Sequence, residues 1–273
     1  MPSPTALAVT EHVPDGLLPD TPLVVLVHGS LDRAASFTRV VRRLDDLHTV
    51  VYDRRGYHRS RQALPLNTTL GGHVDDLLAI IGGRPAVVIG HSYGGDIALA
   101  AALREPGSSS ILSVAAYEPP MPWLAGWRSP GQTAGGRRPA SAQPGSPEET
   151  GAAAERFFRR MVGDAAWDRL PDEAKVARRA DGAALEAELS AIRVAEAPFD
   201  VTALSVPATF GRGERSAVRH RLAVTWLVDH TPGAQLVEIP GASHGAHLTH
   251  PDAFAGLART AVARTGRPVG TIG

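Results

Sequence analysis

Short apolar runs alternate along this chain with longer segments that have helical periodicity. Four apolar runs occupy the first half, at residues 23–27, 49–52, 86–89 and 111–116. Between them, residues 37–47 and 73–81 repeat apolar side chains every three or four positions, as a helix with one buried face does. Strands that alternate with helices in this way form a mostly parallel sheet with helices on both faces. The pattern therefore predicts an α/β fold.

The same alternation returns near the C-terminus. Strand-like runs at residues 207–210 and 235–239 flank an amphipathic stretch at residues 219–228, and a last helix is predicted over residues 252–264. Because these elements repeat the pattern of the first half, we expect them to complete the same α/β core.

The middle of the chain breaks the alternation. Residues 128–150 are rich in Gly, Pro, Ser and Ala and have almost no apolar periodicity, which predicts a flexible segment. Residues 152–195 have a helical pattern, with apolar positions among many charges. We therefore expect a core formed by residues 1–119 and 197–273, into which residues 120–196 are inserted as a helical cap or lid.

Composition limits the classes of function. The chain has 273 residues, 43% of them hydrophobic, so it can bury a substantial core. Its formal net charge is zero and no basic face with interleaved aromatic residues is evident, which argues against a nucleic-acid partner. The lack of cysteine excludes disulfides, thiolate metal sites and a cysteine nucleophile. Because neither a signal peptide nor an apolar run of membrane-spanning length is evident, we expect a cytoplasmic protein without a membrane partner.

Serine chemistry is indicated by the pentapeptide Gly90-His91-Ser92-Tyr93-Gly94, which lies between the apolar run at 86–89 and a helix-like run at 96–103. A G-x-S-x-G sequence between a strand and a helix is typical of a nucleophile elbow, a tight turn that exposes the serine hydroxyl above the sheet. Ser92 is therefore the candidate nucleophile. A serine hydroxyl is a weak nucleophile at neutral pH, so it needs a base within reach and a carboxylate that orients this base.

His244 is the candidate base. It lies in Gly241-Ala242-Ser243-His244-Gly245, directly after the strand-like run at 235–239. A loop at this place carries the imidazole to the carboxyl edge of the sheet, where open α/β sheets bind ligands. His247 and His250 are close enough in sequence for a metal site, but no acidic pattern accompanies them. We expect these two histidines to be solvated or to lie at the pocket mouth, and we expect no metal.

The chain resembles the α/β-hydrolase superfamily in these motifs and in two more. These are His28-Gly29-Ser30 after the first apolar run, and residues 52–60, which are similar to the family's D-x-R-G-x-G-x-S turn. The resemblance covers residues 20–120 and 200–262 and implies an oxyanion hole built from the backbone N–H groups of Tyr93 and Ser30. We expect Asp53, Arg54 and Arg55 to bond within their own turn.

The acid departs from the usual pattern of that family. Its members commonly place an aspartate in a G-x-x-D segment after the penultimate strand, and Ser216 stands at that position here. Glu118, directly after the run at 111–116, and Glu214 are the two alternatives. We favour Glu118, because it follows a strand at the catalytic edge and is succeeded by two prolines that restrict the exit path. A third alternative is that Glu118 anchors the cap hinge and the triad is incomplete.

Our leading hypothesis is a cofactor-independent serine hydrolase that cleaves an ester, thioester or lactone bond through an acyl-serine intermediate. Ser92 attacks, His244 transfers the proton and Glu118 orients His244. One alternative is another chemistry of this superfamily on a natural-product intermediate, by a carbon-carbon hydrolase, perhydrolase or cyclase. The other is a non-catalytic ligand-binding protein. The sequence leaves the oligomeric state open.

We expect the substrate to be a small molecule with an apolar acyl group. Six large apolar side chains of the predicted cap are candidates for a pocket over Ser92. They are Trp123, Trp127, Phe157, Phe158, Met161 and Trp167. Because most such residues in a helical insertion form its own small core, we expect about two of them to line the pocket.

Overall fold

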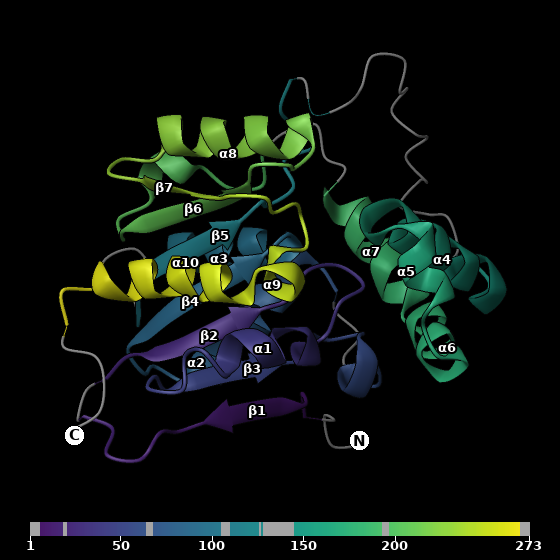
Figure 1. The fold of residues 1–273 in the computed structure, drawn as a ribbon, viewed down its shortest axis with the longest axis horizontal. Coiled ribbons are helices and arrows are strands. Elements are labelled where there is room, and N and C mark those ends of the chain that lie inside the picture. The colour runs from purple at the N-terminus through teal and green to yellow at the C-terminus, as the bar shows by residue number, and fades with distance from the viewer. Residues whose placement is uncertain are drawn as a thin grey trace.

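The computed structural model describes residues 6–18, 21–63, 68–104, 110–125, 127, 145–192 and 197–267. In these residues seven strands form one sheet (Figure 1). In order across the sheet they are β1 (Val9–His12), β3 (Thr49–Tyr52), β2 (Leu23–Val27), β4 (Ala86–His91), β5 (Ile111–Tyr117), β6 (Ala208–Gly213) and β7 (Gln235–Ile239). β1 is antiparallel to β3, and all other neighbours are parallel. The predicted α/β fold with a mostly parallel sheet is confirmed.

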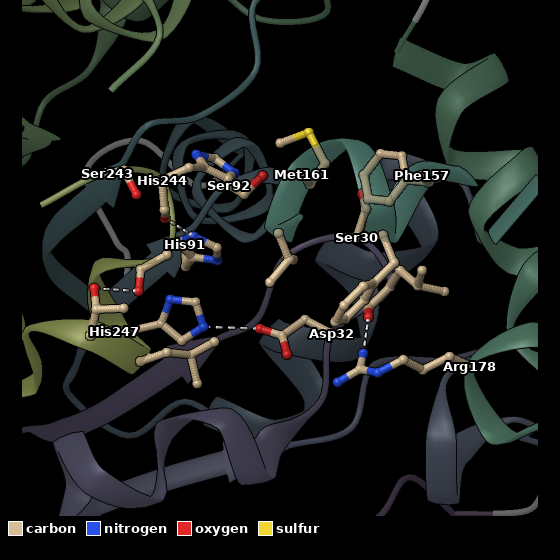
Figure 2. Close-up of a pocket in the computed structure, with 17 residues that line it drawn as sticks. Ser30, Asp32, His91, Ser92, Phe157, Met161, Arg178, Ser243, His244 and His247 are labelled. Atoms are coloured by element: carbon tan, nitrogen blue, oxygen red, sulfur yellow. Dashed lines mark hydrogen bonds and ion pairs between the residues drawn. The ribbon is translucent and has the colours of Figure 1, made fainter. Parts of the chain in front are cut away.

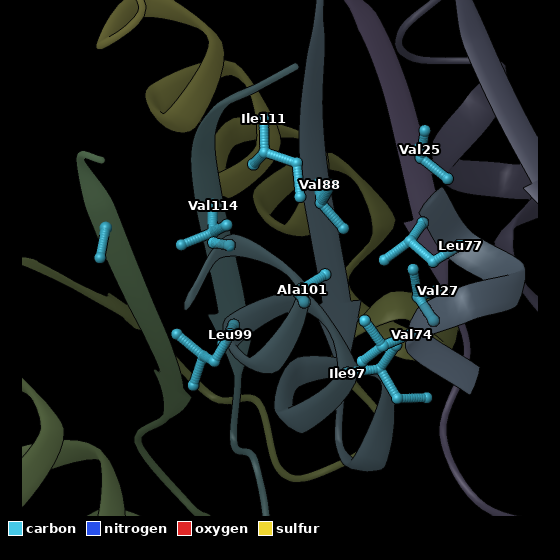
Figure 3. Close-up of a cluster of buried hydrophobic side chains, with 14 of the residues drawn as sticks. Val25, Val27, Val74, Leu77, Val88, Ile97, Leu99, Ala101, Ile111 and Val114 are labelled. Atoms are coloured by element: carbon cyan, nitrogen blue, oxygen red, sulfur yellow. The ribbon is translucent and has the colours of Figure 1, made fainter. Parts of the chain in front are cut away.

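Helices cover both faces of the sheet, and β2 shows the consequence for the sequence. Its residues Leu23, Val25 and Val27 pack into one buried cluster, whereas Val24 and Leu26 pack into the other. A strand buried on both faces has a continuous apolar run, not an alternating one. The first cluster includes side chains of α2 (Leu70–Ile81), α3 (Tyr93–Arg104) and α8 (Val218–His230), some of which Figure 3 shows. The second includes side chains of α1 (Thr38–Val41) and α10 (Pro251–Ala263).

The structure differs from the sequence prediction in two elements. The helix expected over residues 37–47 is only α1, preceded by a 3₁₀ turn at Ala34–Phe37 and followed by turns whose hydrogen bonds join residues three apart. An apolar spacing of three suits these turns as well as a helix, so the side chains are buried as predicted without the longer helix. β1 was not predicted, because all four of its residues are exposed at the sheet edge and form no apolar run.

A group of four helices lies between β5 and β6 in the sequence and beside the sheet in space (Figure 1). They are α4 (Pro147–Val162), α5 (Asp164–Asp168), α6 (Asp172–Ala180) and α7 (Gly182–Ile192). Ser146 begins α4 with a capping box, in which Ser146 Oγ accepts from Glu149 N–H and the Glu149 carboxylate accepts from Ser146 N–H. Most of the predicted flexible segment, residues 128–150, lies outside the described residues, and its last four belong to α4.

The helical group has a small core of its own. Ala154, Phe158, Trp167 and Leu185 pack together and enclose Leu31, which comes from the loop after β2. This loop therefore connects the helical group to the carboxyl edge of the sheet. The remaining short elements are 3₁₀ turns at His58–Ser60 and Val201–Ala203, and α9 (Ala246–Thr249). No described helix has the length and apolar character needed to span a membrane.

Candidate active site

Ser92 lies in a strained turn between β4 and α3. Its φ angle is 53°, a left-handed value that is uncommon for a residue with a side chain and is found most often at functional sites. The turn requires glycine on both sides because the backbone comes very close. A Cβ on Gly90 would lie 2.2 Å from Gly94 O, and a Cβ on Gly94 would lie 2.1 Å from Val27 O. The local sequence thus permits the elbow geometry predicted for Ser92.

The loop after β2 packs directly against the candidate nucleophile. A Cβ on Gly29 would lie 2.9 Å from Ser92 Cβ, so only glycine allows this approach. Arg54 fixes the loop from its other side: its Nε donates to His28 O at 2.8 Å and its Nη2 to Gly29 O at 2.9 Å. In a trans peptide the N–H points opposite to the preceding C=O, so the Ser30 N–H points away from Arg54.

The expectation that Arg54 bonds within its own turn is wrong. Asp53 does pair locally with His58 and Arg59. Arg54, however, reaches the loop after β2, and Arg55 pairs with Asp76 of α2. The sequence offers no signal for these partners, because they lie more than 20 residues away.

His28 is held as a neutral imidazole. The Arg54 backbone N–H donates to His28 Nε2 at 2.9 Å, so the proton resides on Nδ1, which donates to Gly29 O at 2.8 Å. Burial, reinforced by the neighbouring Arg54 charge, lowers the pKa of His28 to about 4. His28 therefore shapes the loop that carries Ser30.

The backbone N–H groups of Ser30 and Tyr93 are available for a ligand. Neither donates to another protein group within the described residues. Tyr93 is the first residue of α3, where a helix has free N–H donors and a partial positive charge.

Glu118 and His244 meet at the end of β5. His244 Nδ1 donates to Glu118 Oε2 at 2.8 Å, and Gly213 N–H donates to the other carboxylate oxygen at 2.8 Å. Glu118 is fully buried and has a φ angle of 49°, so its backbone is also left-handed. Ser92 and His244 line one pocket, shown in Figure 2.

Glu214 has a different partner. Its carboxylate accepts from the Gly241 N–H at 2.7 Å and ties together the loops that follow β6 and β7. Ser216 is buried nearby. Of the two glutamates considered from the sequence, the one in contact with the His244 imidazole is therefore Glu118.

His220 of α8 stacks on the imidazole ring of His244. The ring centroids are 4.4 Å apart and the planes are inclined by 27°. Burial, assisted by the Arg219 charge, lowers the pKa of His220 far below its ordinary value, so this ring is neutral. Its position within the segment Arg219-His220-Arg221 gives no hint of this contact, and sequence reasoning missed it.

A buried ion pair joins the helical group to the loop of Ser30. Glu188 of α7 accepts from Ser30 Oγ at 2.8 Å, pairs with the Arg54 guanidinium and lies 3.1 Å from His73 Nε2. Glu188 and Arg54 have no exposed surface. Burial raises the pKa of Glu188, but the Arg54 charge and the His73 contact outweigh it and hold the pKa well below the usual range. Sequence reasoning missed Glu188.

The pocket has a volume of about 210 Å³ and a mainly apolar wall. Three of the six cap side chains considered from the sequence line it: Phe157, Phe158 and Met161. The other three pack elsewhere: Trp123 against Phe199, Trp127 against His220 and Trp167 in the core of the helical group.

His247 also lines the pocket, and only 2% of its surface is exposed. Within the described residues, two groups of side chains bring three metal-ligating atoms together. They are Asp32–His91–His247 and Glu118–His220–His244. The sequence predicted neither group, because each combines residues from separate strands, loops and helices.

Comparisons with known proteins show the family of this chain. Residues 24–257 match the model of the alpha/beta hydrolase family. The chain is 30% identical to the pimeloyl-[acyl-carrier protein] methyl ester esterase of Chromobacterium violaceum over 237 residues, which cover 85% of this chain and 91% of that protein.

Other similarities are shorter or concern the fold. An uncharacterized hydrolase of Bacillus subtilis is 41% identical over 96 residues, and the match covers 33% of this chain and only 35% of that protein. Matches to a probable oxidoreductase of Mycobacterium tuberculosis span 16% of its length. Among solved structures, the enol-lactonase from Burkholderia xenovorans LB400 has a TM-score of 0.69 at 20% identity and covers 94% of this chain and 96% of its own. This last similarity is one of fold.

Proposed function

This chain belongs to the alpha/beta hydrolase family, and we propose that it is a cofactor-independent serine hydrolase. The proposed reaction is cleavage of an ester, thioester or lactone bond through an acyl-serine intermediate. The observation that carries it is the contact of His244 Nδ1 with Glu118 Oε2 at 2.8 Å. His244 lines the same pocket as Ser92. The relative that is a methyl ester esterase and matches over most of both chains supports an ester as substrate.

In the first half of the reaction, Ser92 Oγ attacks the carbonyl carbon of the substrate. His244 Nε2 takes the hydroxyl proton, because Nδ1 already donates its proton to Glu118. The tetrahedral intermediate then collapses, the bond to the leaving alcohol or thiol breaks, and His244 returns the proton to that group. The acyl group remains on Ser92.

The negative oxygen of the tetrahedral intermediate needs donors that are fixed in advance. The N–H groups of Ser30 and Tyr93 are proposed for this role, because both are free of protein acceptors in the described residues. Arg54 holds the Gly29 carbonyl at 2.9 Å and so orients the Ser30 N–H. Loss of one such donor typically costs about 3 kcal/mol of barrier stabilisation.

In the second half, a water molecule attacks the carbonyl carbon of the acyl-serine, as Ser92 attacked the substrate in the first half. His244 Nε2 accepts a proton from the water, and the same two N–H groups hold the oxygen. Collapse of this intermediate releases the carboxylic acid and returns the proton to Ser92. The complete reaction consumes one water molecule, cleaves one bond and releases a carboxylic acid and an alcohol or thiol.

The proposed division into a core of residues 1–119 and 197–273 and a cap of residues 120–196 assigns substrate selection to the cap. Phe157, Phe158 and Met161 bring apolar surface into the pocket, which supports a small substrate with an apolar acyl group. A cytoplasmic location stays a prediction from the sequence.

Labelling with a fluorophosphonate tests the proposed nucleophile. We expect stoichiometric labelling of the wild type and none of Ser92→Ala. Ser243→Ala is the matched control, because Ser243 lines the same pocket beside His244 and is expected to leave labelling intact. An unlabelled wild type whose fold is intact by circular dichroism would contradict the mechanism.

A substrate screen tests the bond that is cleaved. We expect hydrolysis of p-nitrophenyl butyrate, of a butyryl thioester or of an aliphatic lactone, and its loss in Ser92→Ala. If Ser92 is labelled but none of the three compounds is hydrolysed, the proposed substrate class is wrong, and the carbon-carbon hydrolase or the other superfamily chemistries become the better hypothesis.

A further inference from the structure

A second cluster of polar side chains lines the pocket. Asp32 follows β2, His91 ends β4 and His247 belongs to α9, so three separate segments meet there (Figure 2). One nitrogen or oxygen atom of each residue lies within 4.8 Å of those of the other two. The proposed hydrolysis assigns no role to any of these side chains.

His91 presents a lone pair to this cluster. Its Nε2 donates to His244 O at 2.8 Å, so the proton is on Nε2 and Nδ1 is unprotonated. Nδ1 is buried and has no hydrogen-bond partner in the described residues. A histidine whose second ring nitrogen donates to a backbone carbonyl is the usual arrangement of a metal ligand.

His247 and Asp32 provide the other two donors. His247 is only 2% exposed, its ring centroid is 4.1 Å from that of His91, and its Nε2 is 3.2 Å from Asp32 Oδ2. Two atoms that bind one tetrahedral zinc ion at about 2.0–2.1 Å lie about 3.4 Å apart, so this separation suits shared coordination.

The Asp32 carboxylate has two polar neighbours. Its Oδ2 atom faces His247 Nε2 at 3.2 Å. Ser36 Oγ also donates to Asp32 Oδ2, at 2.9 Å, and so orients the carboxylate. The cluster thus combines one negative oxygen donor with two imidazole nitrogens.

We propose that Asp32, His91 and His247 bind a divalent transition-metal ion of the zinc class. Two imidazoles and one carboxylate are ligands that Zn²⁺ prefers, whereas Mg²⁺ and Ca²⁺ prefer sites made of oxygen alone. All three residues line the pocket that also contains Ser92. The ion lies in the same pocket as Ser92 and reduces the space available to a substrate.

Direct metal binding tests this proposal independently of any hydrolytic activity. The full chain is freed of metal with a chelator and titrated with Zn²⁺ in a calorimeter, and the same titration is done with Co²⁺, whose visible spectrum reports the coordination geometry. We expect one ion per chain and a tetrahedral Co²⁺ spectrum. His247→Ala removes a ligand and is expected to weaken binding by more than about 100-fold, which exceeds the effect of losing a residue that only hydrogen-bonds to a ligand.

Three further variants make the result specific. Asp32→Asn keeps the side-chain size and is expected to weaken binding as well, which guards against misfolding of His247→Ala. His250→Ala, three residues from the proposed ligand, is the matched control and is expected to bind like the wild type. His220→Ala tests the other group, Glu118–His220–His244.

Two outcomes would overturn the proposal. One is a wild type that binds no Zn²⁺, or that binds it no more tightly than folded His247→Ala and Asp32→Asn. The other is weaker binding in His220→Ala with unchanged binding in the other variants, because the ion would then belong to the His244 group. Neither outcome bears on labelling of Ser92.

Discussion

Replacing Glu188 by glutamine tests whether the buried ion pair holds the helical group on the core. The change keeps the size of the side chain and an oxygen that can accept from Ser30 Oγ, but it removes the negative charge. Arg54 then remains buried without a counter-charge, since neither side chain has exposed surface. Removing one partner of a buried pair destabilises a protein by about 3–5 kcal/mol.

This cost is large relative to the whole stability of a domain. A typical free energy of unfolding is about 5–15 kcal/mol, and each kcal/mol shifts Tm by about 2–4 °C in a chain of this size class. We therefore expect Glu188→Gln to lower Tm by about 6–20 °C, measured by circular dichroism, and to lower the midpoint of urea unfolding in parallel.

The matched control is Glu155→Gln in the same helical group. Glu155 pairs with Arg159 and Arg179 at the protein surface, where water and salt weaken ion pairs, so we expect a much smaller change. A loss for Glu188→Gln below about 1 kcal/mol, the range of exposed pairs, would refute the reasoning.

A double-mutant cycle separates the pair from its surroundings. Arg54→Met alone is expected to cost at least as much as Glu188→Gln, because it also removes the donors to His28 O and Gly29 O. The double variant is expected to be more stable than the sum of the two single losses predicts. Strict additivity would show that the two charges do not interact.

Three further predictions concern the candidate active site. Glu118→Gln is expected to lower kcat for p-nitrophenyl butyrate by about 10⁴-fold, as loss of the acid that orients the base does. Glu214→Gln is expected to leave kcat near that of the wild type. Equal effects of the two variants would contradict the assignment of Glu118 as the acid. Gly29→Ala is expected to lower kcat by about 100-fold or more through displacement of the loop against Ser92, and an unchanged kcat would show that the loop adjusts without cost. Burial lowers the pKa of His28 to about 4 in the folded protein, whereas the unfolded chain has the ordinary value of about 6.5. As the pH falls, the unfolded chain therefore takes up a proton at His28 before the folded protein does. The contribution of His28 to the free energy of unfolding is complete above about pH 6.5 and declines by about 3 kcal/mol towards pH 4. Urea unfolding between pH 7.5 and 4.5 measures this, and His28→Asn is expected to flatten the profile; a variant with the same slope as the wild type would exclude His28 as the cause.

The fold followed from the sequence because its signals are local. Strands buried on both faces must be apolar throughout, so β2, β4 and β5 are visible as continuous runs. The elbow is visible for a similar reason, since the close approach at Gly90 and Gly94 leaves no room for a side chain. β1 escaped notice because an exposed edge strand needs no apolar residues.

Local sequence patterns are sufficient to predict the α/β architecture, the turn at Ser92 and the place of His244 after the last strand. Which side chains meet at that edge of the sheet depends on how distant segments pack. Glu118 and His244 are 126 residues apart, and Ser30 and Glu188 are 158 apart. Such contacts depend on strand order and on the docking of α7, which no neighbouring residue specifies. Local chemistry determines what a segment can form, whereas the packing of distant segments determines which buried charges and imidazoles become partners.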